Sequence, residues 1–299
     1  MSLPEEVLLD PVQQQESTIE RATPKRRKRR RWGFWLAVGW IVLVILVALL
    51  APVLPLRPYD EPNFENTLVR PFTTWSDPLG TDELGRSMLS RVIWGARVSL
   101  TIGLFAVAIG MSFGTMLGII GGYVRGPIDR VLAVVSDAMI AFPPLVLLLA
   151  VVTIYQRNVV NITIALAILI VPSFFRLARA NTLVIAERDY VTASVVMGAG
   201  RLRIITREIL PNVTITLLAY APIVIALVII AEGSLAFLGL SLPPPQPSWG
   251  QMINVGRKRL ETDPYLTYVP GAAMVLTVLA FNWVGRGLRV MYDPRQGVL

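Results

Sequence analysis

The sequence predicts an all-α integral membrane protein with six transmembrane helices. Of its 299 residues, 54% are hydrophobic and only 16% are charged, and the mean hydropathy of +0.59 is too high for a soluble domain of this length. The apolar residues gather in six charge-poor runs, each near or above the roughly 17 to 25 residues that a spanning helix needs. These runs are 32–56, 98–124, 131–156, 158–175, 209–231 and 264–285.

The composition also excludes several kinds of site. The chain has no cysteine and no histidine, so it lacks disulfides and the commonest general base and metal ligand. Its lysines are Lys25, Lys28 and Lys258, and none lies in a Gly-Lys-Ser or Gly-Lys-Thr motif, so no phosphate-binding P-loop is present. We therefore expect no catalytic residue, no metal site and no cofactor in this chain.

Residues 1–31 are expected to form a disordered, basic cytoplasmic tail. Little apolar periodicity is found in 1–24, and 25–31 are seven consecutive cations directly before the first apolar run. Such a cluster can bind nucleic acid, but beside a membrane span it more often fixes topology and contacts anionic lipid, so we expect the lipid bilayer and no nucleic acid as its partner. We interpret 32–56 as an uncleaved first helix, because no small-residue cleavage site follows a short apolar region.

The positive charges indicate the orientation. Six spans place both termini on one side of the membrane, and that side holds 19 of the 28 Lys and Arg residues. By the positive-inside rule this side is the cytoplasm. The segment 57–97 is then extracytoplasmic, whereas 189–212 and the C-terminal tail 291–299 are cytoplasmic.

The extracytoplasmic segment is predicted to contain an amphipathic helix. Thr81 or Asp82 would cap it. Its apolar side would be formed by Leu84, Met88, Leu89, Val92 and Ile93.

The second run carries a stripe of small residues, Gly110, Gly114, Gly118 and Gly122, at intervals of four. On a helix these glycines share one face, and small residues there allow close helix contact in lipid. We favour this packing role over a role in gating.

Prolines and acidic residues interrupt other runs. Pro143 and Pro144 should kink the third helix, and Pro172 should kink the fourth. Asp137 and Glu232 lie near predicted helix ends, so structural pairing is at least as good an explanation for them as a substrate or proton site.

The segment 189–212 is a basic island between two apolar runs. Asp189 is predicted to cap a short helix that begins with 190–193 and stops at Gly198, and a second short helix should run from Arg201 to Pro211. Four residues apart, Ser194 and Gly198 would share a face beside Ala193. Small residues on one face predict a docking surface and not a catalytic site.

This island resembles the cytoplasmic coupling loop of binding-protein-dependent ABC importer permeases. The family pattern is Glu-Ala-Ala, three residues, Gly, and then a stretch that ends in Ile-Leu-Pro. The matching positions are Ala193, Ser194, Gly198, Ile209, Leu210 and Pro211, with Tyr190 and Ala199 in the same loop. Thr192 and Ser194 stand where the family usually has Glu and the second Ala, so the resemblance implies no salt bridge from position 192.

A second resemblance is longer. The segment 80–86, Gly-Thr-Asp-Glu-Leu-Gly-Arg, with Ser90-Arg91 and 95–100, is similar to the signature that opens the core of dipeptide, oligopeptide and nickel permeases of the second-subunit type. The segments 232–240, 243–250, 276–289 and 293–295 resemble the same family. The resemblance covers about 79–295 and implies a type I ABC importer permease fold, with a five-helix core at 98–290.

The resemblance also implies partners and a function. A homologous second permease, two cytoplasmic ATPase subunits that hold ATP and Mg, and an extracytoplasmic binding protein would together import di- or oligopeptides across the bacterial cytoplasmic membrane by alternating access. Nickel import is an alternative, although this chain has no His or Cys to bind the metal. A secondary transporter working alone is a second alternative, but we find no internal repeat. A non-transporting scaffold would leave the small-residue face without a purpose.

Overall fold

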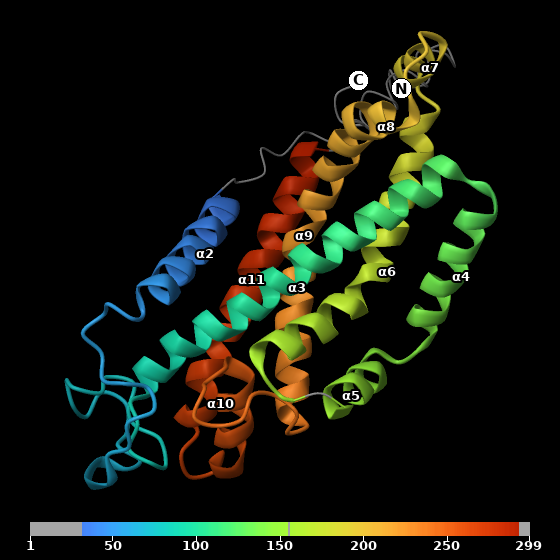
Figure 1. The fold of residues 1–299 in the computed structure, drawn as a ribbon. Helices are drawn as coiled ribbons and strands as arrows, with labels where there is room; N and C mark the ends of the chain where they lie inside the picture. Colours follow the sequence, from blue (N-terminus) through green and yellow to red (C-terminus); the bar gives the residue numbers. More distant parts are fainter. Residues whose placement is uncertain (1–31, 155, 293–299) are drawn as a thin grey trace, which may run out of the picture. The chain divides into compact units, whose positions relative to one another are not determined.

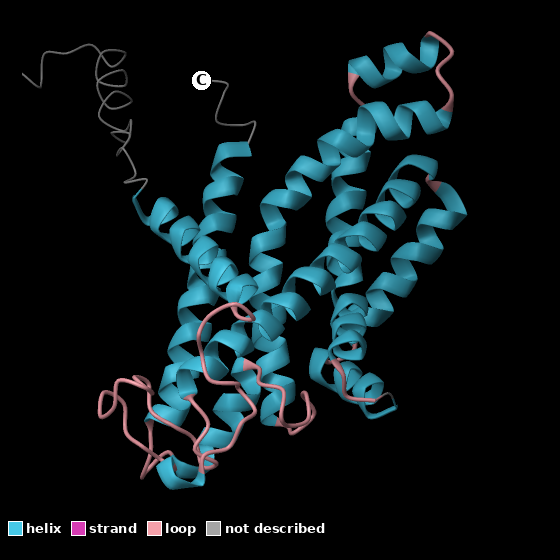
Figure 2. Ribbon diagram, turned by 60° about the vertical axis from the view of Figure 1, so that its left-hand side comes forward, coloured by secondary structure: helices cyan, strands magenta, loops and turns pink. Residues whose placement is uncertain are grey.

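In a computed structural model, residues 32–154 and 156–292 are described, and their regular secondary structure is helical (Figure 2). Across this part of the chain, β structure is limited to one isolated bridge between Thr81 and Ser87. Residues 34–292 belong to one compact unit, which contains all the helices below except the first two residues of α2. The predicted tail 1–31 and most of the tail 291–299 lie outside the described residues.

Five helical segments are long and apolar enough to cross a membrane, or six if one bent pair counts as a single span. The bundle is drawn in Figure 1. The spans are α2 (Trp32–Leu50), α3 (Met88–Val124), α4 with α5 (Gly126–Ala141 and Pro144–Ile154), α6 (Val159–Ala186), the continuous segment Arg201–Phe237 that ends in α9 (Leu210–Phe237), and α11 (Tyr265–Tyr292). Each predicted run therefore corresponds to one span.

The boundaries of the first two spans differ from those predicted. Helix α2 ends at Leu50 and not at residue 56, because prolines at 52 and 55 cannot continue it. Helix α3 begins at Met88, so the predicted amphipathic helix near Thr81 is absent and its apolar residues from Met88 onward belong to α3. The preceding loop contains only a short 3-10 turn, η2 (Phe64–Asn66).

The third predicted run is broken and not merely kinked. Helices α4 and α5 meet at 93°. A residue before proline is pushed out of the helical region, and Phe142 before Pro143 is extended, with φ −73° and ψ 136°. Pro144 then begins α5, a position that proline tolerates because its missing N–H has no partner there in any case.

The second short helix predicted in the basic island does not end at Pro211. Helix α8 (Arg201–Ile204) continues through a π turn, η3 (Ile205–Ile209), into α9. In this turn the Leu210 N–H bonds to the Ile205 carbonyl, five residues back. Proline lies in the first turn of α9, where it is tolerated, and the wider π turn accommodates it within one continuous helix.

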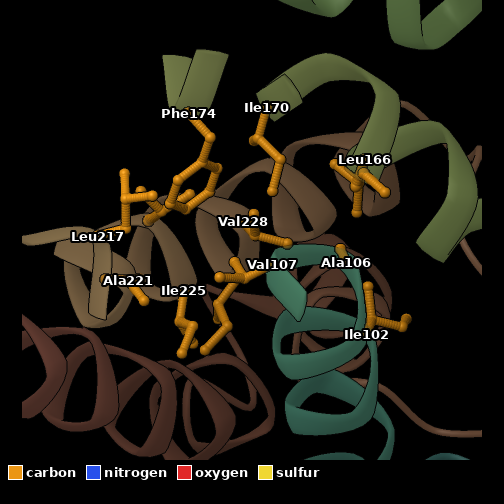
Figure 3. Packing of buried hydrophobic residues seen from close by; sticks show 14 of the residues in the cluster. Ile102, Ala106, Val107, Leu166, Ile170, Phe174, Leu217, Ala221, Ile225 and Val228 are labelled. Atoms are coloured by element: carbon orange, nitrogen blue, oxygen red, sulfur yellow. The ribbon is translucent and has the colours of Figure 1, made fainter. Parts of the chain in front are cut away.

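The core lies where α3, α6 and α9 meet. Figure 3 shows Ile102 and Val107 of α3, Phe174 of α6 and Leu217 of α9 among the side chains that pack there. The glycine stripe of α3 faces α6: a Cβ added at Gly114 would lie 2.6 Å from the Phe174 Cβ and 2.8 Å from the Val171 carbonyl oxygen. The α6 side chains opposite the stripe also repeat every four residues, namely Ile170, Phe174, Ala178 and Thr182.

Between α9 and α11, a connection carries α10 (Trp249–Gly256) and the 3-10 turn η4 (Arg257–Arg259). Ser248 caps α10 by accepting a hydrogen bond from the Gln251 N–H. The Trp249 ring is buried, and its Nε1–H donates to the Val92 carbonyl at 3.0 Å. Helix α10 is thereby fixed against the first turns of α3.

Candidate functional site

A short helix, α7 (Asp189–Val196), stands at one end of the bundle, between α6 and α8 (Figures 1 and 2). Its N-cap is Arg188, so Asp189 is the first helical residue and not the cap as predicted. An acidic side chain in the first turn still interacts favourably with the helix dipole. The helix stops before Gly198, as predicted, because that residue is left-handed with φ +81°.

This left-handed turn corrects the predicted small-residue face. Gly198 has left the helix, so it does not continue a face with Ser194. Ala193 is exposed, Ser194 is half-buried, and a Cβ at Gly198 would meet nothing within 4 Å. The glycine therefore serves the turn, and the surface of α7 is formed by other residues.

Larger apolar side chains make up that surface. Val196 is 81% exposed, Met197 78% and Leu202, on α8, 75%. Val195 is also exposed, and we call these four residues the coupling surface. The sequence analysis did not single out these four residues. Their signal in the sequence is that they are apolar but lie in a basic segment outside the predicted spans.

Buried residues and two hydrogen bonds fix the helices that carry the coupling surface to the rest of the bundle. Val191 of α7 is buried with Ile204 and Ile209 of the following helix in the main hydrophobic core. The Asn212 side-chain amide donates to the Glu208 carbonyl at 2.6 Å and to the Tyr190 hydroxyl at 3.5 Å. The predicted contact residue Ile209 is therefore a support and not an exposed group.

The remaining predicted coupling residues are distributed around this support. Thr192, Leu210 and Pro211 are exposed, and Ala199 is half-buried. The Thr192 hydroxyl donates to the Arg188 carbonyl at 3.4 Å, within its own turn. An exposed apolar patch of this kind beside Arg201, Arg203 and Arg207 is typical of a protein contact surface.

At the opposite end of the bundle, the segment 80–86 folds into a tight loop. The Asp82 carboxylate accepts hydrogen bonds from the N–H groups of Leu84 and Arg86, both at 2.9 Å, and pairs with the Arg86 side chain at 2.7 Å. Thr81 accepts a hydrogen bond at its carbonyl from the Tyr265 hydroxyl of α11, at 2.9 Å. Asp82 and Thr81 therefore order this loop and do not cap a helix.

The two acidic residues singled out from the sequence, Asp137 and Glu232, have different partners. The Asp137 carboxylate accepts a hydrogen bond from Arg176 of α6 at 2.6 Å. Glu232 is 1% exposed and accepts hydrogen bonds at Oε1 from the hydroxyls of Ser241 and Ser248, at 2.8 and 2.7 Å. Both are thus paired, Asp137 with a cation and Glu232 with two hydroxyls that join the end of α9 to the start of α10.

The described residues thus form an all-helical membrane bundle with a small projecting helix that carries an exposed apolar surface. The structure is similar to that of the MetNI methionine ABC transporter in inward-facing conformations, with a TM-score of 0.56, 16% identity, and coverage of 69% of this chain and 98% of that chain. A second crystal form of the same transporter matches with a TM-score of 0.55 at 17% identity, again over 69% of this chain and 98% of that one. The fold is that of a type I ABC importer permease.

Sequence comparison identifies the family. Residues 114–298 match the family described as binding-protein-dependent transport system inner membrane component. Two similar proteins are the glutathione transport system permease protein GsiD of Pectobacterium atrosepticum, 39% identical over 86% of this chain and 85% of its own, and the dipeptide transport system permease protein DppC of Alkalihalophilus pseudofirmus, 38% identical with the same coverage. The chain belongs to this family and is a permease of an ABC importer.

Proposed function

We propose that this chain imports peptides across the bacterial cytoplasmic membrane as one of two different permease subunits. Relatives at 38 to 39% identity are named for the transport of glutathione, a tripeptide, and of dipeptides. The absence of His and Cys argues against the alternative cargo, nickel, because no soft or imidazole ligand is available along the chain. The second permease would be a homologue that pairs with this one in a pseudo-symmetric heterodimer.

The energy would come from two cytoplasmic ATPase subunits that bind ATP and Mg. This chain has no P-loop, so the ATPases must push on it from outside. An extracytoplasmic binding protein would deliver the peptide to the opposite face. The transporter then consists of two coupled two-state elements, the ATPase pair and the permease pair, and the contacts between them carry the coupling free energy.

The observation that supports this proposal most directly is the coupling surface. Its apolar side chains are exposed on α7, on α8 and in the turn between them, and Val191 of α7 and Ile204 of α8 are buried in the core that α3, α6 and α9 share. A partner that moves α7 therefore acts on the packed bundle and not on a loose loop. The coupling loop would include the predicted residues Tyr190, Thr192, Ala193, Ser194 and Ala199 around this surface.

The test is to place a charge on the coupling surface. In the complex reconstituted with its second permease and ATPases, we expect Val196→Asp to weaken ATPase binding by about 2 kcal/mol, roughly thirtyfold, as for a central interface residue. Folding should be preserved because the side chain is 81% exposed. The matched control is Val53→Asp, the same change at a residue 79% exposed that follows α2.

Three results would contradict the proposal. If Val196→Asp and Val53→Asp show equal ATPase binding and equal transport-linked ATP hydrolysis, the coupling surface does not contact the ATPases. Transport by this chain without any ATPase would favour the secondary-transporter alternative. Uptake of nickel without uptake of glutathione, dialanine or trialanine would replace the proposed cargo.

A further inference from the structure

The loop between α2 and α3 carries two exposed aromatic rings close together in the sequence. We call residues 70–76, Arg-Pro-Phe-Thr-Thr-Trp-Ser, the aromatic tip. Phe72 is 86% exposed and Trp75 is 100% exposed. Large aromatic side chains contribute most when they are buried, yet no described residue covers either ring.

The aromatic tip is held at both ends. Before it, the Val69 N–H donates to the Thr81 hydroxyl at 2.9 Å, and the Thr81 N–H donates to the Val69 carbonyl at 3.0 Å. After it, Asp77 is 2% exposed and pairs with Arg57 at 3.3 Å. The exposure of the two rings is therefore that of an anchored segment and not of a loose loop.

The backbone of the tip is strained at one of the two rings. Phe72 has φ +62°, a left-handed conformation that is an outlier for a bulky side chain. Its N–H donates to the Pro78 carbonyl at 3.0 Å, which closes the tip. Such a conformation persists only where the surrounding structure imposes it, and it is found most often at functional sites.

The base of the tip stands beyond the headgroups of the membrane. The charge-free run of α3 begins at residue 98, and Met88, the first residue of α3, precedes it by ten residues, or about 15 Å. A headgroup layer is only about 5 to 8 Å thick. The Met88 N–H donates to the Gly80 carbonyl at 3.0 Å, so the base of the tip is held at the level of Met88. Trp94, with its ring centroid 5.3 Å from the Arg97 guanidinium carbon, lies nearer the interface.

This location narrows the choice of partner. Lipid does not suit the tip, because its base lies outside the headgroup layer. The ATPases do not suit it either, because the loop lies at the end of the bundle opposite α7 (Figure 2). The chemistry is that of a protein contact: Arg70 is exposed and forms no ion pair within the described residues, and Trp and Arg are enriched among the residues that dominate protein interfaces.

We propose that the aromatic tip docks the extracytoplasmic binding protein. Phe72 and Trp75 would enter an apolar pocket on that protein, and Arg70 would pair with a carboxylate at the edge of the pocket. Because the tip is already anchored, docking orders little of the chain and loses little conformational entropy. The identity of the partner rests on the proposed function, which supplies a binding protein and places this end of the bundle outside the cell.

The first test locates the tip and keeps both rings in place. The chain has no cysteine, so Thr74→Cys takes a single bimane label before assembly with the partner subunits in nanodiscs. The probe is the purified peptide-binding protein from the same organism that most stimulates ATP hydrolysis by the wild-type complex. We expect at least threefold protection of the label from aqueous iodide when this protein is saturating, and no quenching by brominated lipid. Quenching by brominated lipid, full protection before the protein is added, or no protection at saturation overturns the proposal.

The second test measures affinity. Phe72→Asn with Trp75→Ser removes both rings, and Asn still tolerates the left-handed conformation at position 72. We expect the affinity of the complex for the same binding protein to fall at least tenfold. The control is Phe64→Ser, an aromatic ring 72% exposed in the same loop but on η2, which should change the affinity by less than twofold. Unchanged affinity in the double variant, or an equal loss in Phe64→Ser, overturns the assignment to the tip.

The two proposals fail in different ways. If no peptide-binding protein stimulates ATP hydrolysis by the wild-type complex although its ATPases are bound, the proposed function fails, and with it the partner of the tip. If stimulation is found but the label at position 74 stays open to iodide, only the docking assignment fails. Binding of the ATPases, measured for each variant, shows that the substituted chains are folded.

Discussion

Helix α6 has two faces that are joined to their neighbours in different ways. Toward α3 it packs against glycines, so closely that a Cβ at Gly118 would lie 2.6 Å from the Ala178 Cβ and 2.7 Å from the Phe175 carbonyl oxygen. Toward α4 it is joined by ion pairs, and α4 exposes large apolar residues such as Val131 and Val134. The α3–α6 contact is close packing of backbone and side chains, whereas the α4–α6 contact includes charged groups that water or another charge can replace.

The largest effect is expected from filling the glycine contact. Gly114→Leu forces its side chain into the Phe174 Cβ and the Val171 carbonyl, and backbone cannot give way as a flexible side chain can. We expect a loss of more than about 3 kcal/mol, the upper end of overpacking, seen as aggregated protein in detergent size-exclusion chromatography. Gly271→Leu is the control, since a Cβ there meets nothing within 4 Å. Equal behaviour of the two variants would show that the α3–α6 contact can open.

An intermediate effect is expected at Asp129. Its side chain is 16% exposed and accepts two hydrogen bonds from Arg179, so Asp129→Asn leaves a partly buried guanidinium without its charged partner. We expect a loss of about 1 to 3 kcal/mol, measured as a lower midpoint of thermal unfolding in detergent. The variant should still form monodisperse protein, unlike Gly114→Leu. If Asp129→Asn loses as much stability as Gly114→Leu, the two faces of α6 contribute equally to the stability of the bundle.

The smallest effect is expected at the exposed pair. The Arg125 and Glu187 side chains are 51% and 71% exposed, so Glu187→Gln should cost at most about 1 kcal/mol. Any loss should shrink further in 1 M salt, where the Debye length is about 3 Å. Thermal unfolding of wild type and Glu187→Gln at low salt and at 1 M salt measures both the loss of stability and its dependence on salt. A larger or salt-independent loss would mean that this pair is buried in the assembled transporter.

Apolar runs predicted the number of spans but not their ends. Pro143 and Pro144 were correctly expected to interrupt a helix, because the residue before a proline leaves the helical region, but the size of the bend, 93°, depends on packing that a local pattern does not contain. Pro211 was wrongly expected to end a helix. Proline is tolerated in the first turn of a helix, and Pro211 lies in the first turn of α9. The π turn η3, which joins α8 to α9 before Pro211, has no signal in the sequence.

The docking role of the loop 189–212 stays a prediction, but the structure shows which of its side chains are exposed. The pattern of Ala193, Ser194 and Gly198 identified the loop, and only its three-dimensional path shows that Gly198 turns the chain while Val196 and Met197 are exposed. Partners that are distant in sequence were out of reach. Arg176 lies 39 residues from Asp137, and no local rule joins them.

The continuous helix from Arg201 to Phe237 has a mechanical consequence. Its 37 residues extend over about 55 Å, with Leu202 of the coupling surface at one end and Glu232, hydrogen-bonded to Ser241 and Ser248, near the other. Buried residues occur along most of this length, among them Val213, Leu217, Val224 and Leu235, so the core holds the helix over its whole span and not at one point. In the proposed importer, any displacement of Leu202 is therefore imposed on the same helix that is tied through Glu232 to Ser248 at the start of α10, at the other end of the bundle.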